Sequence, residues 1–278
     1  MQAFTSTIAD LPRKRANFLR PKIALLLLFC SSLVGCGGGG GSSSGGGISP
    51  IGPATPSPVS LSQYYYGTET NGGASAPVAL SVTQNGSQIT GTWGNQFGGF
   101  ANVGTLTGTV QGTTLSATLT SSIVYQGSPV GCPSVVTATV SGSAINGTFA
   151  TTTTCTAPQS GAFSVQAGTV PPVFSSPTTG SLVDTLAGKG SVSATFSRSG
   201  VIVTGSYSSS FSNGTTGTAG QVYAVVIGSN LYLDLLPAQS NACPFSGIGS
   251  ISGLAVSGNY TAQFCSVSDG GSFTFATF

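Results

Sequence analysis

The feature that most constrains the fold is an alternation of apolar and small residues with a period of two, interrupted by glycine-containing turns. Val78, Leu80 and Val82 alternate with Ala, Ser and Thr; Asn85-Gly86 follows, and the alternation resumes over residues 89–93. Successive side chains of a β-strand point to opposite faces, so each run predicts a strand with one buried face, and Asn-Gly between two runs predicts a tight hairpin.

The same arrangement recurs around Gln111-Gly112 and Ser141-Gly142-Ser143, and the set ends near Val165. Together with residues 61–66, whose Tyr64 and Tyr66 would share one face of a strand, this predicts about eight short antiparallel strands. The inward side chains are expected to form an apolar set without a polar group to orient a ligand: Leu80, Val82, Trp93, Leu106, Leu119, Val140, Phe149 and Phe163.

After a Pro-rich break the pattern starts again, which indicates an internal duplication. Residues 89–93 match 203–207, Cys132-Pro133 matches Cys243-Pro244, and residues 145–149 match 256–260, at a nearly constant separation. The sequence therefore predicts an all-β chain with two tandem antiparallel meander domains, residues 60–168 and 179–278, joined by a linker at 169–178. Each domain is expected to form a small up-and-down β-barrel of about eight strands.

The N-terminal region has the pattern of an export signal. Basic residues precede an apolar run from Ile23 to Val34. That run is shorter than the roughly 20 apolar residues that a transmembrane helix needs. A basic segment followed by a short apolar one is typical of a signal peptide.

The four residues Leu33-Val34-Gly35-Cys36 resemble the lipobox of bacterial lipoproteins at every position. The resemblance implies that residues 1–35 are removed as a lipoprotein signal peptide and that Cys36 carries a diacylglyceryl group and an acylated amino group. These chains would anchor the protein stably in a lipid bilayer. By the sorting rule of that family, Gly37 in place of Asp implies the outer membrane. An ordinary secretory signal is the alternative.

The segment 36–59 is rich in Gly, Ser and Pro and is expected to be a tether between the lipid and the folded part. Export to an oxidising compartment favours disulfides. Each predicted domain holds two cysteines that flank a hairpin, so Cys132 is expected to pair with Cys155, and Cys243 with Cys265. Each closed loop would contribute roughly 3 kcal/mol in the chain-entropy model. Two thiols per domain and no histidine suit neither a redox motif nor a zinc site, so neither metal nor cofactor is expected.

The composition excludes several function classes. Only 4% of residues are charged and the chain has no histidine. The basic side chains beyond Cys36 are Lys189 and Arg198, so no patch remains that would compensate the phosphates of a nucleic acid. A serine nucleophile usually needs a neighbouring base, and none of the carboxylates recurs in both repeats. An enzyme is therefore not expected. If the chain were an enzyme, a site centred on Asp234 would be the least unlikely one.

Residues 90–96, with Gly91-Thr92-Trp93 and Asn95-Gln96, resemble the first strand of the avidin family, whose eight-stranded barrel binds biotin. The resemblance implies a small up-and-down barrel of the avidin and calycin type. It does not imply biotin binding, because that family lines its pocket with several tryptophans and Trp93 is the single tryptophan of this chain. Trp93 and its counterpart Tyr207 are the candidate ligand contacts.

These observations predict a lipid-anchored outer-membrane protein that binds a small apolar ligand or a cell-surface partner without catalysis. The alternative is a structural protein of the cell envelope whose barrels are filled and hold no small ligand.

Overall fold

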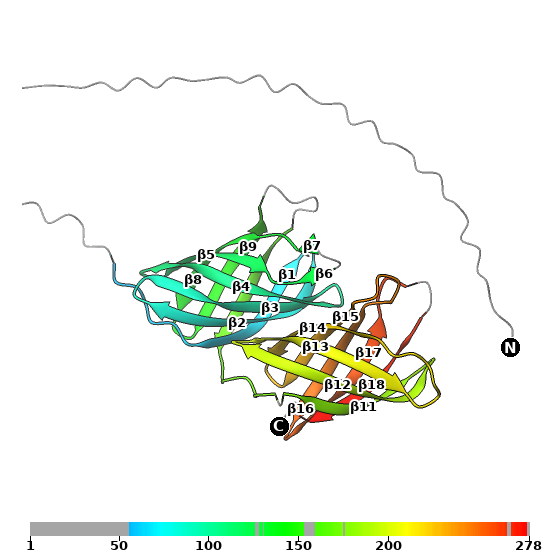
Figure 1. Ribbon diagram of the computed structural model, residues 1–278. Helices are drawn as coiled ribbons and strands as arrows, with labels where there is room; N and C mark the ends of the chain where they lie inside the picture. Colours follow the sequence, from blue (N-terminus) through cyan, green and yellow to red (C-terminus); the bar gives the residue numbers. More distant parts are fainter. Residues whose placement is uncertain are drawn as a thin grey trace, which may run out of the picture. The chain divides into compact units, whose positions relative to one another are not determined.

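In a computed structural model, the structure describes residues 56–125, 128–129, 131–152, 159–174, 176–265 and 268–276. The predicted signal peptide and Cys36 lie outside these residues. One compact unit, Gly52–Phe278, contains two closed antiparallel β-barrels (Figure 1). The described residues include no helix that is long and apolar enough to cross a bilayer.

The first barrel is an up-and-down meander in which each strand pairs with its neighbours and β1 closes the ring against β10. The connection from β5 to β8 carries a small separate sheet of two strands, β6 (Val124–Tyr125) and β7 (Ser128–Pro129). The barrel strands are β1 (Tyr64–Asn71), β2 (Ala74–Asn85), β3 (Gln88–Phe97), β4 (Phe100–Gln111), β5 (Thr114–Ser121), β8 (Ser134–Ser141), β9 (Ala144–Thr151) and β10 (Ser160–Ala167).

The second barrel repeats this topology, with β11 paired to β18. Ile89 in β3 and Val203 in β13 are both the second residue of their strands, which agrees with the duplication seen in the sequence. The predicted fold class is confirmed. The strands are β11 (Thr178–Asp184), β12 (Gly188–Ser199), β13 (Ile202–Phe211), β14 (Ala219–Ile227), β15 (Asn230–Pro237), β16 (Phe245–Ser252), β17 (Ala255–Ala262) and β18 (Gly270–Ala276).

The two ends of each barrel differ in their connections. At one end, here called the turn end, two-residue turns join the strands; Gly86 and Gly142 sit there at φ 59°, a conformation that glycine adopts without steric cost. At the other end, the loop end, the connections include the longer stretches 122–133 and 152–159 of the first barrel. The loop end is therefore the end with the longer connections between strands.

The predicted inward set of the first barrel is confirmed. Leu80, Val82, Leu106 and Val140 are buried in its core, and Trp93, Leu119, Phe149 and Phe163 pack against that core. Tyr65 also belongs to this core, whereas Tyr64 and Tyr66 lie on the other face of β1, as alternation requires. The remaining internal cavity is about 30 Å³, room for no more than a few water molecules.

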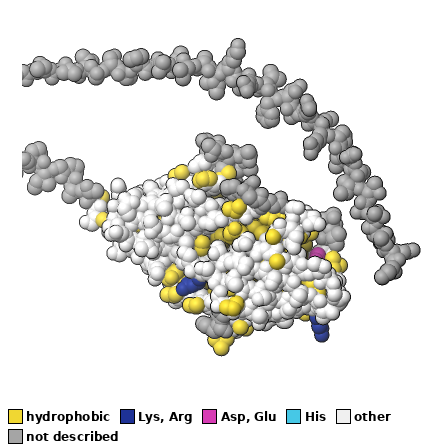
Figure 2. All heavy atoms as spheres, in the orientation of Figure 1, with side chains coloured by type: hydrophobic (Ala, Val, Ile, Leu, Met, Phe, Trp, Pro, Cys, Tyr) yellow, Lys and Arg dark blue, Asp and Glu magenta, His cyan; other side chains and the backbone are white. Residues whose placement is uncertain are grey.

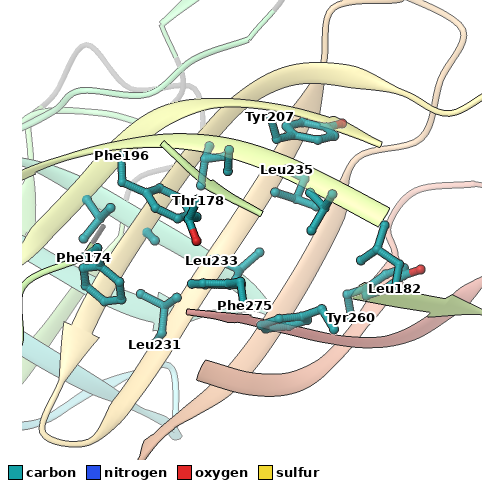
Figure 3. Close-up of a pocket in the computed structure, with 16 residues that line it drawn as sticks. Phe174, Thr178, Leu182, Phe196, Tyr207, Leu231, Leu233, Leu235, Tyr260 and Phe275 are labelled. Atoms are coloured by element: carbon teal, nitrogen blue, oxygen red, sulfur yellow. The ribbon is translucent and has the colours of Figure 1, made fainter. Parts of the chain in front are cut away.

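The second barrel is filled as well. Figure 3 shows Phe196, Tyr207, Leu233 and Phe275 pointing into its interior from different strands, and the cavity left among them is about 40 Å³. Phe174, which precedes β11, is buried in the same core. Neither interior has space for a small organic ligand, which agrees with filled barrels.

The two barrels pack against each other through apolar side chains on their outer faces. A β-carbon added at Gly94 would lie 2.6 Å from Val225 Cγ2, so this contact requires glycine. Thr92 of β3 donates a hydrogen bond to the carbonyl of Ser199 (3.1 Å) and accepts one from the N–H of Val201 (3.2 Å). The buried apolar residues of this interface are Tyr64, Ala79, Ala101, Val103, Ile123, Val201, Ile202, Val225, Ile227 and Leu236.

The surface reflects the low charge of the sequence. Figure 2 shows mostly white atoms, which are backbone and uncharged polar side chains, with charged groups at isolated points. Three of the four described carboxyl groups, those of Glu69, Asp184 and Asp234, are buried. The acidic groups of the folded part are therefore mainly internal.

A disulfide joins Cys243 to Cys265, with the Cα atoms 6.0 Å apart, as predicted. It connects the β15–β16 and β17–β18 loops at the loop end of the second barrel. Cys132 is also a disulfide-bonded cysteine. Cys155 lies outside the described residues, so the pair Cys132–Cys155 stays a prediction.

Candidate functional site

A cavity of about 790 Å³ lies at the loop end of the first barrel. Its floor and most of its wall come from the first barrel, and the second barrel completes the wall with Asp234, Leu236, Pro244 and Phe264. Small-molecule sites usually occupy about 300–1,000 Å³ and combine apolar walls with a few polar groups. This cavity has both properties, whereas the barrel interiors lack the space.

The floor is a chain of hydrogen bonds formed by inward-facing polar residues of three strands. Asn95 of β3 donates through Nδ2 to Oε1 of Glu69 on β1, at 2.6 Å. Asn102 of β4 donates through Nδ2 to Oδ1 of Asn95, at 2.9 Å. Because both groups of the Asn95 amide are used, its orientation is fixed.

Glu69 keeps one oxygen for the cavity. The side chain is only 7% exposed, and Asn95 is its one hydrogen-bond partner among the described residues. In the described part of the chain, Trp93 Nε1 is the one side-chain nitrogen or oxygen atom that is buried and has no hydrogen-bond partner. Glu69 lines the cavity, and its Oε2 atom has no hydrogen-bond partner among the described residues. Burial raises the pKa of Glu69 to about 7, against the opposing effect of the hydrogen bond from Asn95.

The wall is largely aromatic. Trp93, Phe97, Phe100, Phe149 and Phe264 line it. The rings of Phe100 and Phe264 stack across the two barrels, with centroids 5.0 Å apart and planes 13° apart. Phe264 adopts φ 57°, a region that aromatic residues rarely occupy, and its neighbour in the chain is the disulfide-bonded Cys265.

Asp234 connects the barrels. It projects from the outer face of β15 and is 2% exposed. Oδ2 accepts a hydrogen bond from the N–H of Ala101 in the first barrel (3.1 Å), and Oδ1 accepts one from Ser246 Oγ (2.8 Å). Burial raises its pKa to about 7, and these two hydrogen bonds oppose the rise. Since both oxygens have partners, Asp234 fixes the position of the cavity wall.

The two residues singled out in the sequence lie in different places. Trp93 lines the cavity and the core below it, with Nε1 packed near the backbone of Gly104, so the ring rather than the N–H faces a ligand. Tyr207 lines the interior and the loop end of the second barrel. Its hydroxyl lies 3.2 Å from Thr218 Oγ1, and burial raises its pKa. The structure does not bring Trp93 and Tyr207 into one site.

The loop end of the second barrel holds a smaller cavity, of about 300 Å³. The carboxylate of Asp184 there accepts hydrogen bonds from the N–H groups of Leu186 (2.9 Å) and Ala187 (2.7 Å) and from Tyr260 Oη (2.8 Å). Burial and this hydrogen bond raise the pKa of Tyr260. Both carboxylate oxygens of Asp184 thus accept hydrogen bonds from residues of its own barrel, whereas Glu69 has a partner among the described residues at one oxygen.

The expectation that the inward set lacks polar groups was wrong. Glu69 lies at even spacing from Tyr65, and Asn95 lies two residues beyond Trp93, so strand alternation places both inside the first barrel. The alternation of inward and outward residues was therefore enough to place Glu69 and Asn95 inside the barrel. In the part of the chain that the structure describes, no group of three or more Cys, Asp and Glu side chains is placed to hold a metal ion.

No family model matches the chain, and no curated protein matches it. Three solved structures are similar at low identity. A protein of unknown function of the DUF3598 family from Nostoc punctiforme is 13% identical, with 78% of this chain and 96% of that chain covered and a TM-score of 0.27. A candidate outer membrane protein from Bacteroides fragilis is 11% identical, with coverage of 77% and 96% and a TM-score of 0.25. A mutant of the vaccine antigen transferrin binding protein B from Haemophilus parasuis is 11% identical, with coverage of 82% and 76% and a TM-score of 0.26.

Proposed function

We propose that this chain is an exported lipoprotein of the cell envelope that binds a small molecule, without chemical change, in the cavity at the loop end of its first barrel. The observation that carries the proposal is the cavity of about 790 Å³ beside two filled barrels. Its aromatic wall supplies contact area, and the polar floor supplies orientation.

Binding rather than catalysis is supported by the residues at the site. The chain has no histidine. The hydrogen-bond partners of Glu69 and Asp234 are an amide, a hydroxyl and a backbone N–H, none of which acts as a base. Both oxygens of Asp234 already accept hydrogen bonds, so among the described residues Glu69 is the acidic group of the lining that is left to meet a ligand, whereas acid-base catalysis usually uses a pair of groups.

The anchor proposal rests on the lipobox at Cys36 and on the place where the chain enters the first barrel. Val59 and Leu61 pack against the core, and the N–H of Val59 donates to the carbonyl of Gly112 in the β4–β5 turn. The tether therefore joins the turn end, whereas the cavity lies at the loop end.

A structural role without a ligand is the second candidate, and the filled interiors favour it. Native mass spectrometry of gently purified protein separates the two. We expect an adduct that is released on denaturation and is weakened in Ser134→Phe, which places a bulky side chain in the cavity from β8. Val135→Phe is the matched control, because Val135 is 51% exposed and faces away. A clean mass across gentle preparations would favour the structural role.

The anchor has its own test. Cys36→Ser should abolish both lipid labelling and retention in the membrane fraction. Unchanged retention of that variant would contradict the proposed anchor while leaving the cavity proposal in place.

A further inference from the structure

We infer that the ligand of this cavity is a protonated amine with an apolar body, whose ammonium group lies against Glu69. This inference rests on the proposed function, since it names the ligand class of the same cavity. It follows from the charge, hydrogen bonding and aromatic content of the site.

Charge selects against anions. The charged groups that line the cavity are Glu69 and Asp234, both acidic, and the two basic side chains of the described region, Lys189 and Arg198, do not line it. An anionic ligand would meet two carboxyl groups and no compensating cation. A cation meets an attractive group at the floor.

Hydrogen bonding leaves one acceptor unused. Burying a carboxylate is costly unless it is paired, and Glu69, which is 7% exposed, accepts a hydrogen bond from the described residues at Oε1 alone. A cationic group at Oε2 would supply the missing partner and a charge-assisted hydrogen bond. A neutral hydroxyl could also donate to Oε2, but that hydrogen bond would lack the charge assistance that an ammonium group supplies.

The aromatic wall suits the same ligand class. Faces of Trp, Tyr and Phe attract cations within about 6 Å of the ring centroid. Trp93, Phe149 and Tyr125 line the cavity together with Glu69. The rings also provide apolar contact area for the body of the ligand, so one compound can satisfy the floor and the wall together.

The state of Glu69 makes this binding depend on pH. The residues opposite Glu69 in the sheet are Ala76 on β2 and Phe163 on β10, neither charged, and the other titratable groups lining the cavity are Asp234 and Tyr125. With its pKa raised to about 7, Glu69 must lose its proton to pair with a cation. Affinity for a cation should therefore rise between pH 6 and pH 8.

Three probes of similar body and different charge test the inference: 2-phenylethylamine, 2-phenylethanol and phenylacetate. Binding to the full-length lipoprotein in phospholipid vesicles is followed by the fluorescence of Trp93, the single tryptophan of the sample. At pH 8 we expect the amine to bind about tenfold more tightly than the alcohol, the scale of one hydrogen bond to a charged group, and phenylacetate to bind most weakly. Glu69→Gln should remove the preference for the amine, whereas Asp269→Asn, which removes a carboxylate of the second barrel, should preserve it.

The outcomes separate this inference from the proposed function. Equal affinity for amine and alcohol, or an unchanged preference in Glu69→Gln, would overturn the cation inference while cavity binding stands. If no probe changes Trp93 fluorescence in the wild type, the cation inference is overturned, whereas a co-purified adduct in native mass spectrometry would still support the proposed function. Ser134→Phe should weaken the response to every probe, and far-ultraviolet circular dichroism verifies that each variant is folded.

Discussion

Protonation of Glu69 and Asp234 is expected to make the folded chain more stable at pH 5 than at pH 7.5. Both carboxyl groups are buried, 7% and 2% exposed, and burial raises the pKa of each to about 7. In an unfolded chain the pKa of either group is about 4. Between these values the folded state holds a proton that the unfolded state has released, so the free energy of unfolding increases as the pH falls.

The magnitude follows from the size of that window. A group that binds a proton in the folded state but not in the unfolded state changes the free energy of unfolding by about 1.4 kcal/mol per pH unit. Two such groups over the roughly two units between pH 7 and pH 5 give about 2–5 kcal/mol. The absence of histidine makes the test clean, because no imidazole titrates in this range. Most of this stabilisation should be lost as the pH rises through 7.

Urea unfolding of the full-length chain at pH 5 and pH 7.5, with the disulfides intact, measures the difference. The variant that combines Glu69→Gln with Asp234→Asn removes both titrations and should show little pH dependence, whatever its overall stability. Equal or lower stability of the wild type at pH 5, or a pH dependence that survives in the double variant, would refute the reasoning.

Three further changes test the contact between the barrels and the loop end. Thr92→Val leaves two backbone groups of the second barrel without their partner and should lower the free energy of unfolding by about 1–3 kcal/mol in urea titrations, whereas Thr90→Val at an exposed position should change little. Gly200→Ala places a β-carbon at φ 60° against Ser and Thr side chains of the first barrel and should destabilise by more than about 1 kcal/mol, seen as a lower thermal midpoint. Replacing both Cys243 and Cys265 by Ala should remove about 3 kcal/mol, and an unchanged unfolding midpoint would contradict that estimate.

The fold could be predicted from the sequence because its signals are local. Alternation assigns each side chain to a face, and Gly86 or Gly142 marks a turn within a few residues of the strands that it joins. The pairing of Cys243 with Cys265 follows from the same hairpin logic, since the two residues flank one pair of strands. Each of these inferences needs only neighbouring residues.

The contact between the barrels could not be predicted in this way. Ala79, Val103 and Val225 occupy outward positions that would suit an exposed strand face, and only the arrival of the other barrel buries them. The cavity depends on the same contact, because Asp234 and Phe264 reach it from the second barrel. Glu69 is a different case: alternation placed it inside, but its partner Asn95 and its free oxygen became evident only in three dimensions.

The duplication separates scaffold from site. Both barrels keep eight strands, a filled core and a loop end, yet among the described residues the large cavity lies at the loop end of the first, where it is lined by Glu69. At the loop end of the second barrel, the backbone and Tyr260 occupy the carboxylate of Asp184. The second barrel instead contributes its outer face, through Asp234 and Phe264, to the wall around the site of the first. The two copies therefore perform different tasks in one cavity, which explains why none of the acidic residues recurs between the repeats.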